Sequence, residues 1–92
     1  MKTERAVVYY AGRVQGIGFR YTCRALALEF SVTGYVKNLA DGRVELAVEG
    51  QREEAEKFLQ AIQESDLKSF IRNRTLDWQP AMAQWKDFHI EH

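Results

Sequence analysis

The sequence predicts an α+β fold in which two helices cover one face of a mostly antiparallel sheet. Two stretches place apolar residues at the spacing of an amphipathic helix, and β-type runs lie before, between and after them. One of these runs alternates apolar and polar residues, which is typical of a strand with one buried face and one solvated face. The order strand, helix, strand, strand, helix, strand is the split βαβ, or ferredoxin-like, sandwich, here with a short additional C-terminal strand.

The first part of the chain predicts a strand, a loop and a helix. Residues Ala6–Ala11 are rich in Val and Tyr, which indicates a strand that is apolar on both faces and central in the sheet. The loop that follows contains Gly12, Gly16 and Gly18. A helix is expected over Phe19–Phe30, because apolar residues recur there at helical spacing. These residues are Phe19, Cys23, Leu26, Ala27 and Phe30.

Two strands joined by a tight turn come next. Tyr35–Leu39 is predicted to be the second strand, and the pair Asp41-Gly42 is a hairpin turn signal. Arg43–Glu49 is predicted to be the third strand because its residues alternate. Its apolar residues are Val44, Leu46 and Val48.

The sequence from Gly50 to the C-terminus predicts a second helix and two strands. The helix follows Gly50, and its apolar residues occupy positions i, i+3, i+4 and i+7. They are Ala55, Phe58, Leu59 and Ile62. A fourth, less regular strand is expected over Ser69–Trp78, a loop from Pro80, and a last short strand over Trp85–Ile90.

Composition limits the possible classes of protein. Residues 1–92 are expected to form a single domain, and their 13 basic and 13 acidic residues argue against a sequence-independent nucleic-acid binder or a polybasic membrane-surface protein. Cys23 is the only cysteine, so no intrachain disulfide can form. The N-terminus lacks the apolar core of a signal peptide, and no apolar run is long enough to span a bilayer. We therefore expect a cytoplasmic monomer.

The glycine-containing loop has the chemistry of an anion site. Glycines allow positive φ angles, so that successive N–H groups converge, and the N-terminus of the next helix adds partial positive charge. Arg20, in the first turn of that helix, brings a permanent cation. Neither a P-loop nor the G-x-G-x-x-G fingerprint is present. This pattern predicts a cradle for phosphate or carboxylate, although glycines that serve only a tight turn are the alternative.

Two segments resemble the signatures of the acylphosphatase family. Gly12–Arg20 reads G-R-V-Q-G-I-G-F-R and resembles G-[RK]-V-Q-G-V-[GF]-F-R, with Ile17 in place of valine. Gly34–Gly42 reads G-Y-V-K-N-L-A-D-G and resembles G-[FYW]-[AV]-x-N-x-x-[DG]-G. The resemblance implies a small hydrolase that cleaves acyl phosphates into a carboxylate and inorganic phosphate, without a cofactor or metal. In the fourth strand the valine-x-x-valine pattern usual in the family is replaced by Ile71 and Arg74, which predicts a polar edge or a shifted register.

The resemblance also assigns roles to residues. Arg20 and Asn38 take the catalytic positions, with Asn38 orienting the attacking water. The phosphate is held by Arg20 and by the loop backbone, namely Gln15, Gly16, Ile17, Gly18 and Phe19. Considered alone, Arg20 would be a solvated helix arginine and Asn38 a residue that caps the hairpin turn.

The same fold also serves two other functions. Acylphosphatase-like domains within larger maturation proteins handle carbamoyl phosphate, but a chain of 92 residues leaves no room for the partner domains. An RNA-binding ferredoxin-like module would carry an aromatic consensus on its third strand, where this chain reads Arg-Val-Glu-Leu-Ala-Val-Glu. Tyr9, Tyr10 and Tyr35 are therefore expected to pack in the sheet rather than stack on bases.

Overall fold

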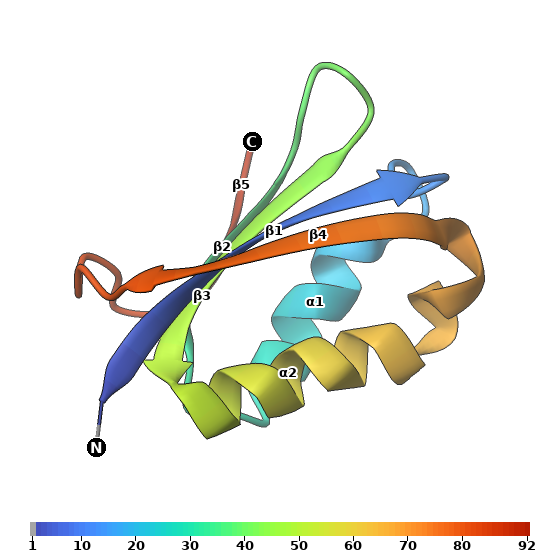
Figure 1. Cartoon of the computed structure of the whole chain (residues 1–92). Coiled ribbons are helices and arrows are strands. Elements are labelled where there is room, and N and C mark those ends of the chain that lie inside the picture. Colours follow the sequence, from blue (N-terminus) through green and yellow to red (C-terminus); the bar gives the residue numbers. More distant parts are fainter. Residues whose placement is uncertain (1) are drawn as a thin grey trace.

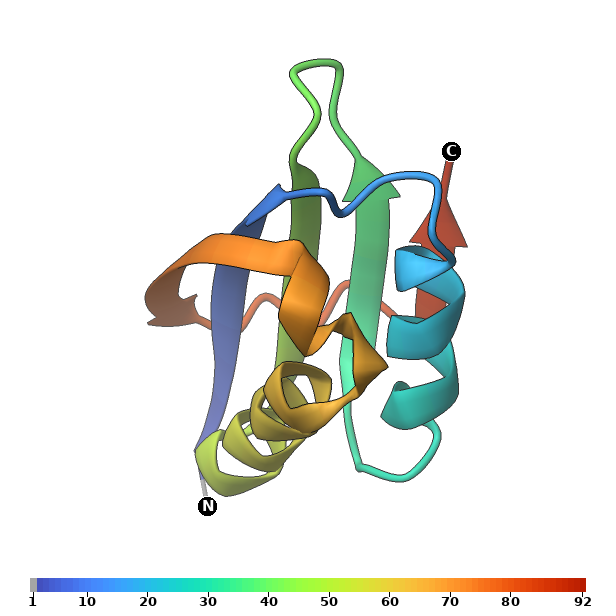
Figure 2. The ribbon, with the colours of Figure 1, turned by 90° about the vertical axis from the view of Figure 1, so that its right-hand side faces the viewer.

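The computed structural model describes residues 2–92, which form a five-stranded sheet with both helices on one face (Figures 1 and 2). The order of elements is the predicted one, with one added turn of 3-10 helix, labelled η1. The elements are β1 (Thr3–Gly12), α1 (Phe19–Ala27), β2 (Thr33–Asn38), β3 (Val44–Gln51), α2 (Arg52–Glu64), η1 (Asp66–Phe70), β4 (Ile71–Pro80) and β5 (Phe88–Glu91).

The strand order confirms the ferredoxin-like fold. It runs β4-β1-β3-β2-β5, so the strands that are neighbours in the sheet are mostly not neighbours in the sequence. β1 pairs antiparallel with β3 and with β4, β2 pairs antiparallel with β3, and only β5 runs parallel to its neighbour β2. β4 and β5 are therefore the two edges of the sheet.

The core lies between the sheet and the two helices. Alternate residues of β1 and β3 point to the helices and are buried, and they meet the apolar stripes that the spacing predicts for α1 and α2. The buried residues of these elements include Ala6, Val8, Tyr10, Phe19, Cys23, Ala27, Val44, Leu46, Val48, Ala55, Phe58, Leu59 and Ile62. Cys23 is thus a core residue, and burial raises the pKa of its thiol.

Two predicted details are wrong in part. β1 lies inside the sheet as expected, but only one of its faces is fully buried, since Val7 and Tyr9 are half-buried on the opposite face. α1 ends at Ala27, not at Phe30, because the chain tightens into i to i−3 hydrogen bonds as it turns towards β2. The ring of Phe30 still packs near Phe58, with ring centroids 6.1 Å apart, which explains why the helical spacing continues.

The ends of the sheet also differ from the prediction. β4 begins at Ile71, after η1, and runs through Pro80, which an edge strand tolerates because one of its sides carries no ladder bonds. Arg72 and Arg74 are exposed on β4, and its register with β1 shifts at Gly12, so both the polar edge and the irregular register are present. β5 is restricted to Phe88–Glu91, because the preceding residues cross the sheet as a loop.

That loop, residues 81–87, crosses the face of the sheet opposite the helices (Figure 2). Glu49 holds it there: its carboxylate accepts hydrogen bonds from the amides of Met82 (2.7 Å) and Ala83 (3.0 Å). The same carboxylate is paired with Arg5 at 2.9 Å, and the Arg5 guanidinium lies 4.2 Å from the ring centroid of Trp85. Glu49, with only 3% of its surface exposed, therefore joins the centre of the sheet to the loop that leads to β5.

The Glu49 contacts predict an acid-dependent contribution to stability. Burial raises the pKa of Glu49, but the hydrogen bonds from the two loop amides and from Arg5 outweigh this effect, so that the pKa lies below its ordinary value of 4.5. Such a carboxyl stabilises the fold above the pKa of the unfolded chain, and this contribution is lost as the pH falls through the folded pKa. Glu49→Gln should cost about 2 kcal/mol of unfolding free energy in urea at pH 7. The penalty should shrink as the pH falls below 4.5, and an equal penalty at pH 3 and pH 7 would contradict this assignment.

Candidate functional site: an anion cradle above the sheet

A hollow of about 200 Å³ lies where the loop after β1 passes over the end of β2. Three parts of the chain meet around it: the loop, the first turn of α1 and the last residue of β2. The lining residues are Val14, Gly16, Gly18, Phe19, Arg20, Tyr21 and Asn38. The structure therefore brings the two sequence motifs to one place: six of the lining residues lie between Val14 and Tyr21, and Asn38 comes from the end of β2.

The loop backbone is left free to bind an anion. Gly16 and Gly18 have φ angles of +78° and +82°, a region that other residues adopt only with strain. Within residues 2–92, none of the N–H groups of residues 15–19 donates to a backbone carbonyl. Gly12, in contrast, lies against the backbone of Phe70 and Arg72 and does not line the hollow, so its role is in packing.

Positive charge accumulates at the start of α1. Gly18 is the N-cap and offers no side-chain acceptor, and the first turn contains no acidic residue. Arg20 is the second residue of the helix and lines the hollow. In the part of the chain that the structure describes, no carboxylate forms a salt bridge with its guanidinium. An arginine without a partner beside free amides favours an anionic ligand.

Asn38 lines the same hollow and has an unsatisfied side-chain oxygen. It is the last residue of β2, and its Oδ1 atom is buried without a hydrogen-bond partner among residues 2–92. Buried polar atoms are nearly always satisfied, so an exception at the wall of a hollow indicates a group that bonds to a ligand or to water. The hairpin turn is instead held by Asp41, which accepts hydrogen bonds from the amide (3.1 Å) and guanidinium (2.8 Å) of Arg43. Because Asp41 has this role, the interpretation of Asn38 as a hairpin cap is not needed.

Gln15 connects the loop to the hairpin, a contact that sequence reasoning missed. Its Nε2 group donates to the carbonyls of Leu39 (2.8 Å) and Arg43 (2.9 Å), at the two ends of the turn between β2 and β3. The side chain therefore points to the hairpin, and neither Gln15 nor Ile17 is among the residues that line the hollow. The only sequence signal for this link was a long amide side chain between two glycines.

The tyrosines on the face opposite the helices are engaged by the protein itself. Tyr9 and Tyr35 both donate hydrogen bonds to the carboxylate of Glu45, at 2.8 and 3.0 Å. The hydrogen bond that the Tyr9 hydroxyl donates to Glu45, together with burial and the nearby negative charge, raises the pKa of Tyr9 above its ordinary value. The ring of Tyr35 also packs edge-on against Trp85 of the crossing loop. These contacts, around a carboxylate that repels phosphates, support the predicted packing role.

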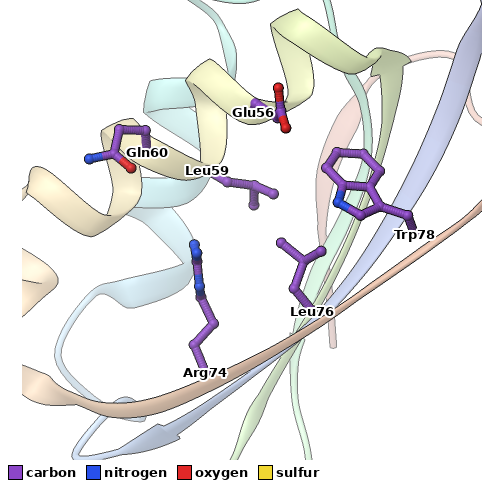
Figure 3. A pocket seen from close by; sticks show the side chains of 6 residues that line it. All are labelled: Glu56, Leu59, Gln60, Arg74, Leu76 and Trp78. Carbon is purple, nitrogen blue, oxygen red and sulfur yellow. The ribbon is translucent and has the colours of Figure 1, made fainter.

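A second hollow of about 210 Å³ lies between α2 and β4 (Figure 3). Arg74 extends from β4 towards Gln60 of α2, and the apolar side chains of Leu59 and Leu76 face each other between them. Glu56 and Trp78 complete the lining, and the Arg52 guanidinium lies 3.9 Å from the centroid of the Trp78 ring. Arg74 meets no glycine loop and no helix N-terminus in this hollow, so the cradle beside Arg20 is the stronger candidate site.

Across residues 2–92, no three side chains of His, Cys, Asp or Glu come together in a way that could hold a metal ion. Neither helix in this range is long and apolar enough to cross a membrane.

The sequence as a whole matches one family. The family model for acylphosphatase covers residues 6–90. The chain belongs to the acylphosphatase family. An acylphosphatase from Mycobacterium sp. (strain JLS) is 39% identical over 85 residues, which cover 92% of this chain and 90% of that protein. The chain is thus an enzyme of the acylphosphatase family, and this membership supports the hydrolysis of acyl phosphates.

The fold agrees with solved acylphosphatase structures. The crystal structure of acylphosphatase from Bacillus subtilis superposes with a TM-score of 0.88 at 29% identity, over 97% of this chain and 99% of that one. Full-length HypF in a phosphate- and nucleotide-bound form contains a similar domain, with a TM-score of 0.85 over 99% of this chain but only 12% of HypF. At 23% identity, the likeness to HypF concerns the fold alone.

Proposed function

We propose that this acylphosphatase hydrolyses acyl phosphates by direct attack of water on phosphorus, using the hollow beside Arg20. The observation that carries the proposal is one hollow lined by Gly16 and Gly18 of a loop with free amides, by Arg20, which has no salt bridge among the described residues, and by Asn38, whose buried Oδ1 has no partner among them. Donors for a phosphoryl group and a holder for water therefore face one small volume. The domain would act with no cofactor, on a small-molecule substrate.

The reaction requires positioning more than acid catalysis. An acyl phosphate is a mixed anhydride, and its carboxylate is a good leaving group. The water oxygen forms the new bond to phosphorus, the bond from phosphorus to the acyl oxygen breaks, and the carboxylate departs with that electron pair. The proton of the water passes to phosphate or solvent. Holding the phosphoryl group and the water in line is then the main task of the protein.

The cradle supplies the charge stabilisation. The loop amides and the fork of Arg20 donors suit the equatorial oxygens of the phosphoryl group, on which charge is spread in the transition state. Because Gly16 and Gly18 set the loop conformation in advance, the amides need no rearrangement when the substrate arrives. Each such donor contributes roughly 3 kcal/mol to transition-state binding.

Asn38 suits the task of holding the water. Its amide can accept a hydrogen bond from water through Oδ1 and donate one through its NH2 group. A neutral side chain adds no negative charge that would repel the phosphate. The absence of a partner for Oδ1 among the described residues leaves this atom free for water.

The direct test is hydrolysis of benzoyl phosphate with and without EDTA. Because the phosphate is held by amides and an arginine, we expect turnover at the same rate in both conditions. The measurement is the loss of benzoyl phosphate absorbance at pH 7, with heat-inactivated protein as the control. No turnover would overturn the proposed function, and a loss of activity that only a divalent metal restores would overturn the proposed mechanism.

Alanine variants should separate phosphate binding from water orientation. Asn38→Ala should lower kcat by roughly a hundredfold, since the water is no longer held in line, while inorganic phosphate still inhibits competitively. Arg20→Ala should weaken both catalysis and phosphate inhibition, because it removes the cation and its donors. The measurements are kcat and the inhibition constant of phosphate for each variant. Wild-type turnover in the first, or wild-type inhibition in the second, would remove that residue from the mechanism.

The link through Gln15 predicts energetic coupling to Asn38. Gln15→Met keeps the length of the side chain but removes both hydrogen bonds to the hairpin that carries Asn38. We expect kcat to fall about tenfold in the wild-type background, and by less than twofold in an Asn38→Ala background, as expected for residues that act as a unit. A double-mutant cycle on kcat checks this, with urea unfolding as the control for stability. Additive effects on kcat would show that Gln15 does not act through Asn38.

A further inference from the structure

A third hollow adjoins the phosphate cradle and shares a wall with it. It measures about 290 Å³ and lies between α1 and β5. Its lining residues are Tyr21, Arg24, Asp87, Phe88, His89, Ile90 and His92. Tyr21 lines both this hollow and the cradle, and 69% of its surface is exposed. A substrate whose phosphate lies in the cradle can therefore extend across the Tyr21 ring into the space beside β5.

The two arginines of α1 are spaced for a ligand with two anionic groups. Arg20 and Arg24 lie four residues apart, which places them on the same side of the helix with a separation of roughly 6 Å between their Cβ atoms. Within the described residues, neither arginine forms a salt bridge. Arg20 lines the cradle, and Arg24 lines the adjoining hollow.

The acidic group in the adjoining hollow is engaged by another residue. Asp87 has its carboxylate 3.1 Å from Nδ1 of His89, and the other nitrogen of that ring lies 3.9 Å from Glu91. His89 is thus the neighbour of the Asp87 carboxylate. Among the residues that line this hollow, Arg24 is the one whose side chain is permanently positive.

We infer that the hollow beside Tyr21 and Arg24 receives the acyl group, and that Arg24 favours acyl phosphates with a second negative charge, such as a distal carboxylate. This inference rests on the proposed function, because it needs the phosphate to be held at Arg20. The Tyr21 ring offers a flat apolar surface for the body of the acyl group. Arg24 is then a specificity-determining residue, not one that contacts the reacting atoms.

The test compares two substrates of similar size, 4-carboxybenzoyl phosphate and 4-methylbenzoyl phosphate. The specificity is the ratio of their kcat/KM values. Arg24→Gln should lower this ratio about fivefold, the effect of an exposed ion pair, because only the carboxylated substrate loses a partner. Turnover of the methyl substrate should change less than twofold. Arg72→Gln removes the same charge from β4, at the opposite edge of the sheet from β5, and should leave the ratio unchanged.

Each other outcome overturns the inference. An unchanged ratio in Arg24→Gln would show that the acyl group does not lie beside Arg24. An equal fall in both variants would show that the net charge of the protein, and not this hollow, sets the preference. If the unmodified protein hydrolyses neither substrate, the proposed function fails and the acyl site fails with it. If it hydrolyses both at a ratio that Arg24→Gln leaves intact, only the acyl site fails.

Discussion

Two hydrogen bonds from the side chain of Gln15 hold together the two segments that form the site. The loop after β1 and the hairpin between β2 and β3 are far apart in the sequence, and each would otherwise end as an exposed turn. Gln15 bonds to the carbonyls of Leu39 and Arg43, so the glycine loop is kept against the strand end that carries Asn38. Without this contact the glycine loop would keep its own conformation, but its distance from Asn38 would not be set.

The sheet fixes the other half of this geometry. β1 pairs antiparallel with β3, with Tyr10 opposite Val44, so the loop that leaves β1 emerges at the same end of the sheet as the hairpin. α1 then returns along the face that its apolar stripe covers, which puts the positive end of the helix at the hollow. The chain has no net charge, yet this corner is locally positive, because the described residues that line the hollow include Arg20 and no Asp or Glu. Local arrangement, not overall charge, makes it suitable for an anion.

Much of the fold could be predicted from the spacing of apolar residues in the sequence. Apolar residues at helical spacing, such as Phe19 and Phe58, and alternating apolar residues, such as Val44 and Leu46, predict one buried face for each element. The structure buries these residues as expected. The glycine loop next to Arg20 predicted an anion site from local chemistry. Prediction was poorer where the backbone responded to distant partners. β5 is shorter than its apolar alternation suggested, because Glu49 draws the preceding loop across the sheet.

The sequence by itself determined the elements, their order and the chemical groups of the candidate site, since these depend on neighbours a few residues away. The tertiary structure decided which groups meet. It placed β4 at an edge where Arg72 is exposed, turned the Gln15 side chain away from the cradle, and put Tyr21 between two hollows. A hydrogen bond or a shared wall between distant segments depends on how the sheet and helices pack in space. Periodicity along the chain carries no record of that packing.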